Sequence, residues 1–271
     1  MITILYKNNM FKKTAIILIT TIALVTNVWA SSDGDLILSK NNPAEINDCS
    51  EGFNRASFAL NQGLDKIIFK PVASVYRSLP SPIKVGVSNS LDNLSNLITI
   101  PNNVLQGDFA TAGVNTGRFI INSTVGVLGL IDVATYIGLS DYEKEDYGQS
   151  LALAGVGPGC YIVLPVLGPS TARDTVSTAI NFFGGDPWYN ITVRNNTHYF
   201  KDSDYYISKI SGGVDFRAKN YDSIENLEKN SLDFYASVKS LYLQDRQQKI
   251  LNTKKIINTQ NDSDWEEIDT D

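Results

Sequence analysis

The chain has 271 residues, of which 43% are hydrophobic and 19% are charged, and its formal net charge is −6. This apolar fraction supports a packed core and excludes wholesale disorder, and the length suits one large domain or two small ones. An acidic chain without a basic block is a poor partner for nucleic acid, because phosphate neutralisation requires Lys and Arg. The same balance argues against electrostatic docking onto anionic lipid, so any membrane contact is expected to be apolar.

The first 30 residues have the organisation of a secretory signal peptide. Lys12 and Lys13 form a positive region, residues 14–25 carry no charge, and Ala30 occupies the last position before a predicted cleavage site. The apolar run is short for a bilayer, which needs about 20 residues, although a retained membrane anchor is the alternative interpretation. We therefore expect export, with residues 1–30 removed as a signal peptide.

After the signal peptide, the sequence predicts one mainly helical domain between two polar segments. Residues 31–47 are expected to form a polar leader, and residues 48–250 the domain itself. Residues 254–271 carry six acidic residues against two lysines, which is typical of a solvated charge run. We expect residues 251–271 to form an acidic, disordered tail.

Apolar residues at helical spacing predict four helices, at residues 53–67, 83–98, 109–120 and 232–242. Asp108 is a suitable N-cap for the third helix, because its carboxylate can accept a hydrogen bond from the first turn. Pro71 is expected to end the first helix and Pro101 the second, since proline disfavours helical geometry in the residue before it.

Two long apolar segments break this pattern, at residues 119–142 and 147–172, and the second carries no charge. Their length would suit a membrane span, but the prolines argue against a straight helix. One interpretation is a buried loop and short helix in a soluble core, which the residues alone favour. The other is a broken hairpin beside an apolar or amphipathic conduit, because irregular backbone at membrane depth must be buried or line a cavity.

The motifs of hydrolytic, metal-dependent and nucleotide-binding enzymes are missing from the sequence. His198 is its one histidine, whereas zinc sites use several His, Cys or carboxylate ligands at short spacing. No G-x-S-x-G nucleophile elbow, P-loop or G-x-G-x-x-G fingerprint occurs. We therefore expect a protein that is not an enzyme and uses neither a metal nor a cofactor.

Charged and amide side chains beside apolar sequence are the candidate functional residues. Arg118 precedes one apolar segment and Asp132 lies within it. A charge in apolar surroundings must be paired or must line water. These charges therefore form either structural ion pairs, the ordinary outcome, or a polar rim that meets a lipid headgroup. The same two interpretations apply to Asn54, Arg55, Asn61, Asp65, Arg173 and Asp174.

The two cysteines, Cys49 and Cys160, leave two interpretations open. Export would permit a disulfide, which would close a long loop and stabilise the chain by roughly 4–5 kcal/mol in the chain-entropy model. Otherwise both remain free thiols, because the sequence does not place them within bonding distance.

Six short sequence words resemble, in order and spacing, those of the MlaA/VacJ family. They occupy residues 51–55, 70–73, 105–108, 118–124, 146–150 and 164–174. The likeness covers roughly residues 48–188 and a C-terminal helix near residues 231–248. The lipid-channel candidates that this resemblance carries over are Asn54, Arg55, Asn61, Asp65, Arg118, Asp132, Gly148, Tyr161, Leu164, Pro165, Arg173 and Asp174.

The resemblance implies a fold and a function. Members of the family lie in the outer membrane of Gram-negative bacteria, so the expected fold is a mainly helical, ring-like single domain embedded there, with a central amphipathic channel. The expected function is phospholipid transport, which removes mislocalised phospholipid from the outer leaflet and maintains lipid asymmetry. The implied partners are phospholipid, a trimeric outer-membrane porin and a soluble periplasmic lipid carrier.

Two other classes of function are alternatives to transport. A structural or partner-binding protein of the outer membrane or cell surface would bind a macromolecule without moving lipid. A periplasmic lipid hydrolase would need an activated nucleophile, for which the sequence has no motif.

The sequence departs from the family at the membrane anchor. Most members are lipoproteins with a cysteine at the cleavage point, whereas no cysteine follows the apolar run here and Cys49 lies too far away. We therefore expect an outer-membrane protein on the periplasmic side that is attached through its folded body. A further hypothesis is that residues 132–165, which are rich in glycine, form a flexible hairpin that gates lipid entry.

Overall fold

The computed structural model describes residues 46–193 and 200–266. All of these residues belong to one compact unit, Asn41–Asp271. The predicted signal peptide, nearly all of the leader and His198 lie outside the described residues.

Helices account for most of the described chain, as the sequence predicts. They are α3 (Glu51–Leu64), α4 (Lys70–Arg77), α5 (Ser81–Leu105), α6 (Phe109–Thr124), α7 (Val133–Tyr136), α8 (Tyr147–Leu153), α9 (Ala172–Ile180), α10 (Asp202–Lys219), α11 (Tyr221–Asn230) and α12 (Phe234–Glu266). The π-helical turns between them are η2 (Asp65–Phe69), η3 (Asn181–Gly185) and η4 (Tyr189–Val193). The strands β1 (Tyr161–Leu164) and β2 (Gly168–Thr171) form an antiparallel hairpin.

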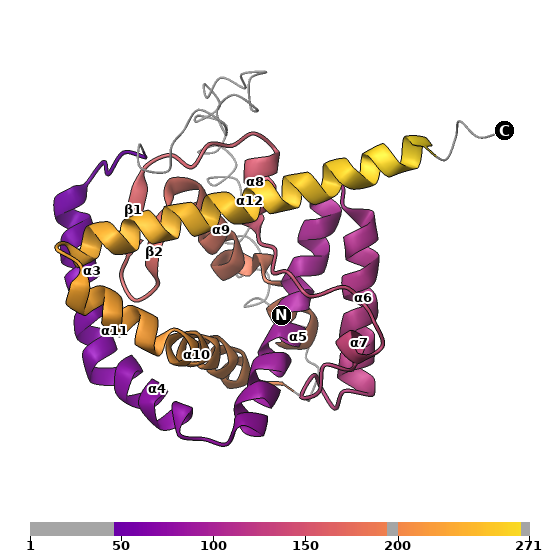
Figure 1. Cartoon of the computed structure of the whole chain (residues 1–271), viewed down its shortest axis with the longest axis horizontal. Helices are drawn as coiled ribbons and strands as arrows, with labels where there is room; N and C mark the ends of the chain where they lie inside the picture. Colours follow the sequence, from indigo (N-terminus) through magenta and orange to yellow (C-terminus); the bar gives the residue numbers. More distant parts are fainter. Residues whose placement is uncertain (1–45, 194–199, 267–271) are drawn as a thin grey trace, which may run out of the picture. The chain divides into compact units, whose positions relative to one another are not determined.

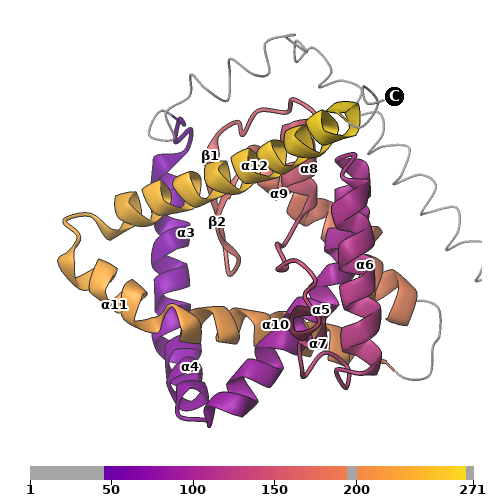
Figure 2. The ribbon, with the colours of Figure 1, turned by 45° about the vertical axis from the view of Figure 1, so that its right-hand side comes forward.

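Within this unit, the helices follow one another around a central opening (Figure 1, Figure 2). α5 packs against α6, α10 packs against α4 and α5, and α11 leads into α12. α12 contacts α8 and β2 on the opposite side of the opening from α4. The mainly helical, ring-like arrangement that the resemblance implies is therefore confirmed.

Two prolines expected to end helices lie inside continuous helical paths instead. The turn η2 joins α3 to α4, and Pro71 occupies the first turn of α4, where a missing N–H is tolerated after the wider π-helical turn. Pro101 lies inside α5. There the next residue adds a bond to the helix backbone, because Asn102 Nδ2 donates to Ile98 O at 2.8 Å. The predicted cap is present: Asp108 accepts from Thr111 N at 2.9 Å.

The C-terminal segment differs from the predicted tail, because α12 continues to Glu266. Residues 251–266 are therefore helical in the structure. Ile250 is buried, and Thr253 Oγ1 donates to buried Glu145 Oε1 at 3.0 Å. These contacts hold the helix just past the expected boundary, and a helix that packing has begun extends at little cost per residue.

Residues 132–165 also differ from the single flexible hairpin of the gating hypothesis. Two aspartates divide the segment by starting helices, since each side chain accepts hydrogen bonds from the first turn. Asp132 accepts from Thr135 N and begins α7, and Asp146 accepts from Gly148 N and begins α8. The hairpin of the structure lies further along the chain, in β1 and β2.

Cys49 and Cys160 form a disulfide, with their Cα atoms 5.6 Å apart. Beside it, Tyr161 N donates to Asn47 O at 2.9 Å. The end of the leader is thus attached to the start of β1, and the interpretation of two free thiols is wrong.

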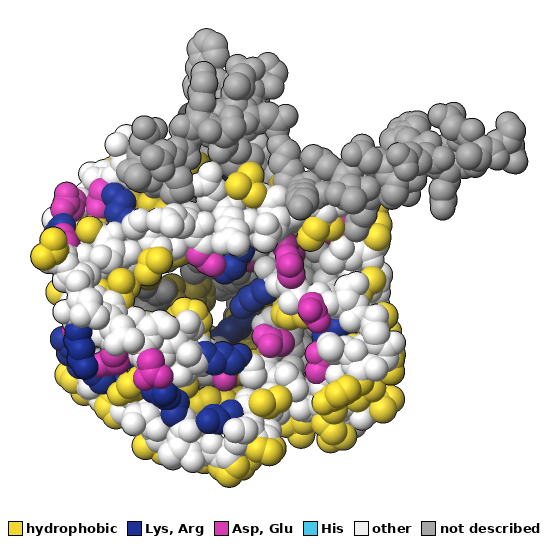
Figure 3. All heavy atoms as spheres, in the orientation of Figure 1, with side chains coloured by type: hydrophobic (Ala, Val, Ile, Leu, Met, Phe, Trp, Pro, Cys, Tyr) yellow, Lys and Arg dark blue, Asp and Glu magenta, His cyan; other side chains and the backbone are white. Residues whose placement is uncertain are grey.

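Large apolar side chains are exposed on the outside of this unit, where Figure 3 shows hydrophobic groups along the outer edge. The most exposed include Ile67 (77%), Val75 (69%), Leu128 (72%), Tyr136 (83%) and Phe183 (82%). Contiguous exposed apolar surface marks an interaction site for protein or membrane. Within the part of the chain that the structure describes, no helix is long and apolar enough to cross a membrane.

Candidate functional site

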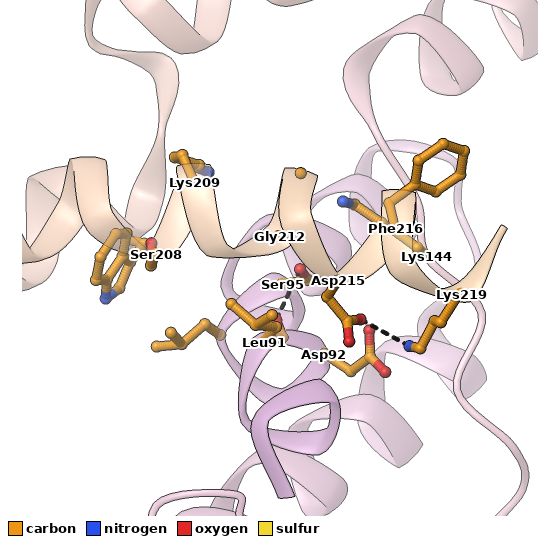
Figure 4. A pocket seen from close by; sticks show the side chains of 13 residues that line it. Leu91, Asp92, Ser95, Lys144, Ser208, Lys209, Gly212, Asp215, Phe216 and Lys219 are labelled. Carbon is orange, nitrogen blue, oxygen red and sulfur yellow. Dashed lines mark hydrogen bonds and ion pairs between the residues drawn. The ribbon is translucent and has the colours of Figure 1, made fainter. Parts of the chain in front are cut away.

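Charged side chains gather around the central opening, whereas hydrophobic side chains gather along the lower part of the outer edge (Figure 3). A pocket of about 400 Å³ lies there, between α5, α10 and the segment before α8. Its charged lining residues are Asp92, Lys144, Lys209, Asp215 and Lys219. Figure 4 shows that they come from three separate parts of the chain and approach one shared space.

Three of these five charges have partners. Lys219 Nζ lies 2.8 Å from Asp215 Oδ2, one helical turn away on α10. Lys209 Nζ lies 2.9 Å from Oδ2 of Asp186, a carboxylate that is 1% exposed. These pairs make the α10 side of the pocket close to neutral.

Asp92 and Lys144 are the pocket charges without such partners, because neither side chain makes a hydrogen bond or ion pair with another described residue. Both are exposed to the pocket, yet protein surrounds the pocket on several sides. Desolvation therefore raises the pKa of the Asp92 carboxyl, against the opposing effect of Lys219 and Lys144. Desolvation likewise lowers the pKa of the Lys144 ammonium group.

A second pocket, of about 260 Å³, lies between α5, α6 and the α7 region, and shares Asp92 with the first. Asn93 and Asn96 line it and are 4% and 2% exposed. The Oδ1 atom of each is buried and has no hydrogen-bond donor among the described residues. A buried acceptor without a donor is costly, so this wall of the pocket is suited to a ligand that donates hydrogen bonds.

The predicted residues Arg118 and Asp132 form an ion pair in the same second pocket. Arg118 Nη2 lies 2.8 Å from Asp132 Oδ2, and Arg118 Nη1 donates to Ser140 O at 2.7 Å. Burial disfavours the ionised Asp132 carboxylate, but hydrogen bonds from Thr135 and Asn122 and the charge of Arg118 hold its pKa below the ordinary value. The geometry agrees with a structural ion pair, the ordinary one of the two interpretations of these charges.

Asp174 belongs to a buried cluster around Arg246 of α12. The Arg246 guanidinium lies 2.6 Å and 2.7 Å from the two Asp146 oxygens and 2.9 Å from Asp174 Oδ1. Arg173 Nε lies 3.2 Å from the same Asp174 oxygen. Gly148 is required by this packing, because a Cβ there would lie 2.3 Å from Asp174 Oδ1 and 2.4 Å from Arg246 Nη2. Burial disfavours both carboxylates, but Arg246 holds the pKa of each below its ordinary value.

Asn54 and Asn61 of α3 attach the β-hairpin to the helices. Asn54 Nδ2 donates to Tyr161 O at 2.9 Å, and its Oδ1 accepts from Val163 N at 2.9 Å. Two turns later, Asn61 Nδ2 donates to Leu164 O at 2.9 Å. These amides pair the free edge of β1, so their role in the structure is to position the hairpin.

Three of the remaining predicted residues form ion pairs or a turn. Arg55 Nη2 lies 2.7 Å from Asp233 Oδ2, and Asp65 Oδ1 lies 2.8 Å from Arg217 Nε. Pro165 is exposed at the turn of the hairpin. Of the twelve predicted residues, only Arg118 and Asp132 line either of the two pockets.

The charges of the first pocket were not predicted from the sequence, although α5 carries a signal for them. Asn89, Asn93 and Asn96 recur at helical spacing beside Asp92, within a helix that is otherwise apolar on one side. A polar stripe of this kind on a buried helix indicates a wet or ligand-binding interior. Lys144 carried no such signal, because it lies in a charge run that is usually solvated.

The described residues form a mainly helical protein with many exposed apolar side chains and a charged, pocketed opening, an arrangement suited to contact with both apolar and polar groups. The chain belongs to the MlaA lipoprotein family, whose model matches residues 46–249.

Relatives and a solved structure agree with this membership. The chain is 33% identical to the intermembrane phospholipid transport system lipoprotein MlaA of Escherichia coli, over 73% of this chain and 76% of that protein. It is 34% identical to an uncharacterized protein of Rickettsia bellii, over 79% and 83% respectively. A structure described as a structural basis for maintenance of bacterial outer membrane lipid asymmetry superposes with a TM-score of 0.63 at 31% identity, and covers 75% of this chain and 98% of that one.

Proposed function

We propose that this chain works in intermembrane phospholipid transport: it removes mislocalised phospholipid from the outer leaflet of the outer membrane and passes it to a soluble periplasmic carrier, which maintains lipid asymmetry. The observation that carries this proposal is the charged, pocketed opening inside an exterior with exposed apolar side chains. The names of the E. coli and Haemophilus influenzae relatives give the same transport system.

The two surfaces match the two parts of a phospholipid. Exposed apolar side chains on η2, α4 and η3 provide contact for acyl chains, because burying apolar surface in lipid is favourable. The charges at the opening solvate the headgroup, which would otherwise lose its water on entering an apolar layer. No covalent step is needed, and the chain acts as a binding path and not as an enzyme.

The same surfaces support a location and a mode of attachment. We propose that the chain lies at the outer membrane, on its periplasmic side, with the folded body held by the exposed apolar side chains. A trimeric porin, the partner that the family resemblance implies, is the proposed neighbour, and exposed apolar surface can pack against another membrane protein as well as against lipid.

The test is the amount of phospholipid in the outer leaflet of intact cells that lack this gene, and of the same cells complemented with it. Deletion should raise outer-leaflet phospholipid, and the gene should restore it. A Gly212→Trp variant should fail to restore it, because Gly212 lines the first pocket and a Cβ there meets nothing within 4 Å, so the indole fills open space.

Gly52→Trp is the matched control, since Gly52 is exposed at the start of α3 and a Cβ there also meets nothing within 4 Å. It should complement fully. Unchanged outer-leaflet phospholipid after deletion, with the protein present in the outer membrane of the parent strain, would contradict the proposal and favour a structural or partner-binding role.

A further inference from the structure

The first pocket contains two opposite charges that the protein itself leaves unpaired. Asp92 from α5 and Lys144 from the segment before α8 both line it, and neither has an ion-pair partner among the described residues. Desolvation disfavours the charged form of each, as the raised pKa of Asp92 and the lowered pKa of Lys144 show. Neither charge therefore stabilises the fold. A ligand that carries one positive and one negative group would give each of them an oppositely charged partner.

The two ends of the site also differ, because hydrogen-bond acceptors gather on the Asp92 side. Asn93 and Asn96 follow on the same helix and present buried Oδ1 atoms without donors in the adjoining pocket. Away from that side, Lys144 lies on the segment before α8, whereas Lys219 lies near Asp92 and is paired with Asp215. A ligand that fits has an anionic group at one end and a hydrogen-bond-donating cation at the other.

We propose that these adjoining pockets bind the headgroup of a phospholipid that carries a primary ammonium group. Lys144 faces the phosphate, and Asp92 faces the ammonium. An ammonium group has three N–H donors and no acceptor, so the free oxygens of Asn93 and Asn96 can take the donors that Asp92 leaves. This inference rests on the proposed function and adds to it the class of headgroup.

Two other headgroups fit less well, for different reasons. A glycerol headgroup has the phosphate but no cation. Asp92 would then stay desolvated without a cationic partner, and the negative charge of the lipid would repel its carboxylate. A choline headgroup has the cation but no N–H, so it leaves the Asn93 and Asn96 acceptors unsatisfied. The expected order of binding is phosphatidylethanolamine, then phosphatidylcholine, then phosphatidylglycerol.

The experiment offers these three lipids, in equal amounts, to the purified full chain in maltoside micelles. After repurification, the lipids that remain bound are measured by mass spectrometry. The wild-type chain should retain the ethanolamine lipid over the glycerol lipid. Asp92→Asn should lower that ratio about fivefold, the effect of one charge-assisted hydrogen bond. Lys144→Gln should lower retention of all three lipids by a similar factor, because each contains the phosphate.

Matched controls remove the same charges from an exposed pair on α12. Asp245 and Lys249 lie 2.7 Å apart and are both more than half exposed, so Asp245→Asn and Lys249→Gln should leave all retention unchanged. Asp92→Ser is a second variant at the pocket, and like Asp92→Asn it breaks no hydrogen bond.

The outcomes distinguish the headgroup preference from the proposed phospholipid transport. If wild type retains all three lipids equally, or Asp92→Asn and Asp92→Ser keep the wild-type ratio, the headgroup inference is overturned while lipid binding stands. If wild type retains none of the lipids, the proposed transport function fails, and the inference fails with it.

Discussion

Two groups of charges in this protein have opposite surroundings. Around Arg246, the carboxylates of Asp146 and Asp174 are fully paired, and Gly148 leaves no room for another atom. In the first pocket, Asp92 and Lys144 lie in open space without partners. The first group joins α8, α9 and α12 and serves stability, whereas the second is available to a ligand. Charge near apolar sequence is therefore a poor guide to function until its partners are known.

Removing Arg246 should give one of the two largest changes in stability. Arg246→Met leaves two partly or fully buried carboxylates without their cation, which we expect to lower the free energy of unfolding by about 3–5 kcal/mol. Urea unfolding in detergent micelles, followed by tryptophan fluorescence, measures it. Lys249→Met, one turn further along α12 in an exposed pair, is the control and should change stability by less than about 1 kcal/mol. Similar effects of the two variants would refute the contrast.

Opening the disulfide should give an effect of similar size. The Cys49–Cys160 bond spans 111 residues of sequence, so the double variant Cys49→Ser/Cys160→Ser gains unfolded-state entropy and should lose about 4–5 kcal/mol of stability. The same unfolding experiment, with and without reductant, checks this value. Reductant should destabilise the wild type and leave the double variant unchanged, and equal responses would argue against the bond.

Glu145 should give a smaller effect that depends on pH. The residue is 5% exposed, and desolvation raises the pKa of its carboxyl to about 6, although hydrogen bonds from Gln106 and Thr253 oppose the shift. Because the folded state binds this proton more tightly than the unfolded state, stability should rise by about 1 kcal/mol as the pH falls from 7 to 5. Glu145→Gln should flatten that part of the profile. A variant profile as steep as that of the wild type would assign the change to another group.

The smallest expected effect is at Asp92. Asp92→Asn removes a charge that has no partner, so the free energy of unfolding at pH 7 should stay within about 0.5 kcal/mol of wild type or rise slightly. A loss of 2 kcal/mol or more in urea would show that Asp92 is structural after all, and would remove the contrast with the Arg246 cluster.

The sequence predicted individual helices well and their connections poorly. Apolar periodicity located α3, α5 and α6, and the Asp108 cap was visible because it depends on residues three apart. The prediction that Pro71 and Pro101 end helices was wrong. A π-helical turn and the packing of α5 on α6 decide whether a helix continues at these positions, and both depend on tertiary structure. The ring arrangement came from the family resemblance and could not have come from periodicity.

The site was less predictable than the fold. Family words marked Asn54, Asp174 and Gly148, which the structure places in supporting contacts. The pocket charges come from α5, α10 and the segment before α8, and only folding brings these together. A single sequence shows which charges exist but not which lack a partner, and that second property separates Asp92 from Asp174.

The exposed apolar side chains impose a condition on how the protein is made. With Ile67, Phe183 and similar residues exposed on its outside, the folded chain is expected to self-associate in an aqueous compartment. An exported copy therefore requires a holding factor, or rapid capture by a membrane, during its passage through water. Biogenesis and anchoring then depend on the same side chains. A substitution that makes this surface polar would therefore keep the chain soluble during its passage through water but weaken its attachment to the membrane.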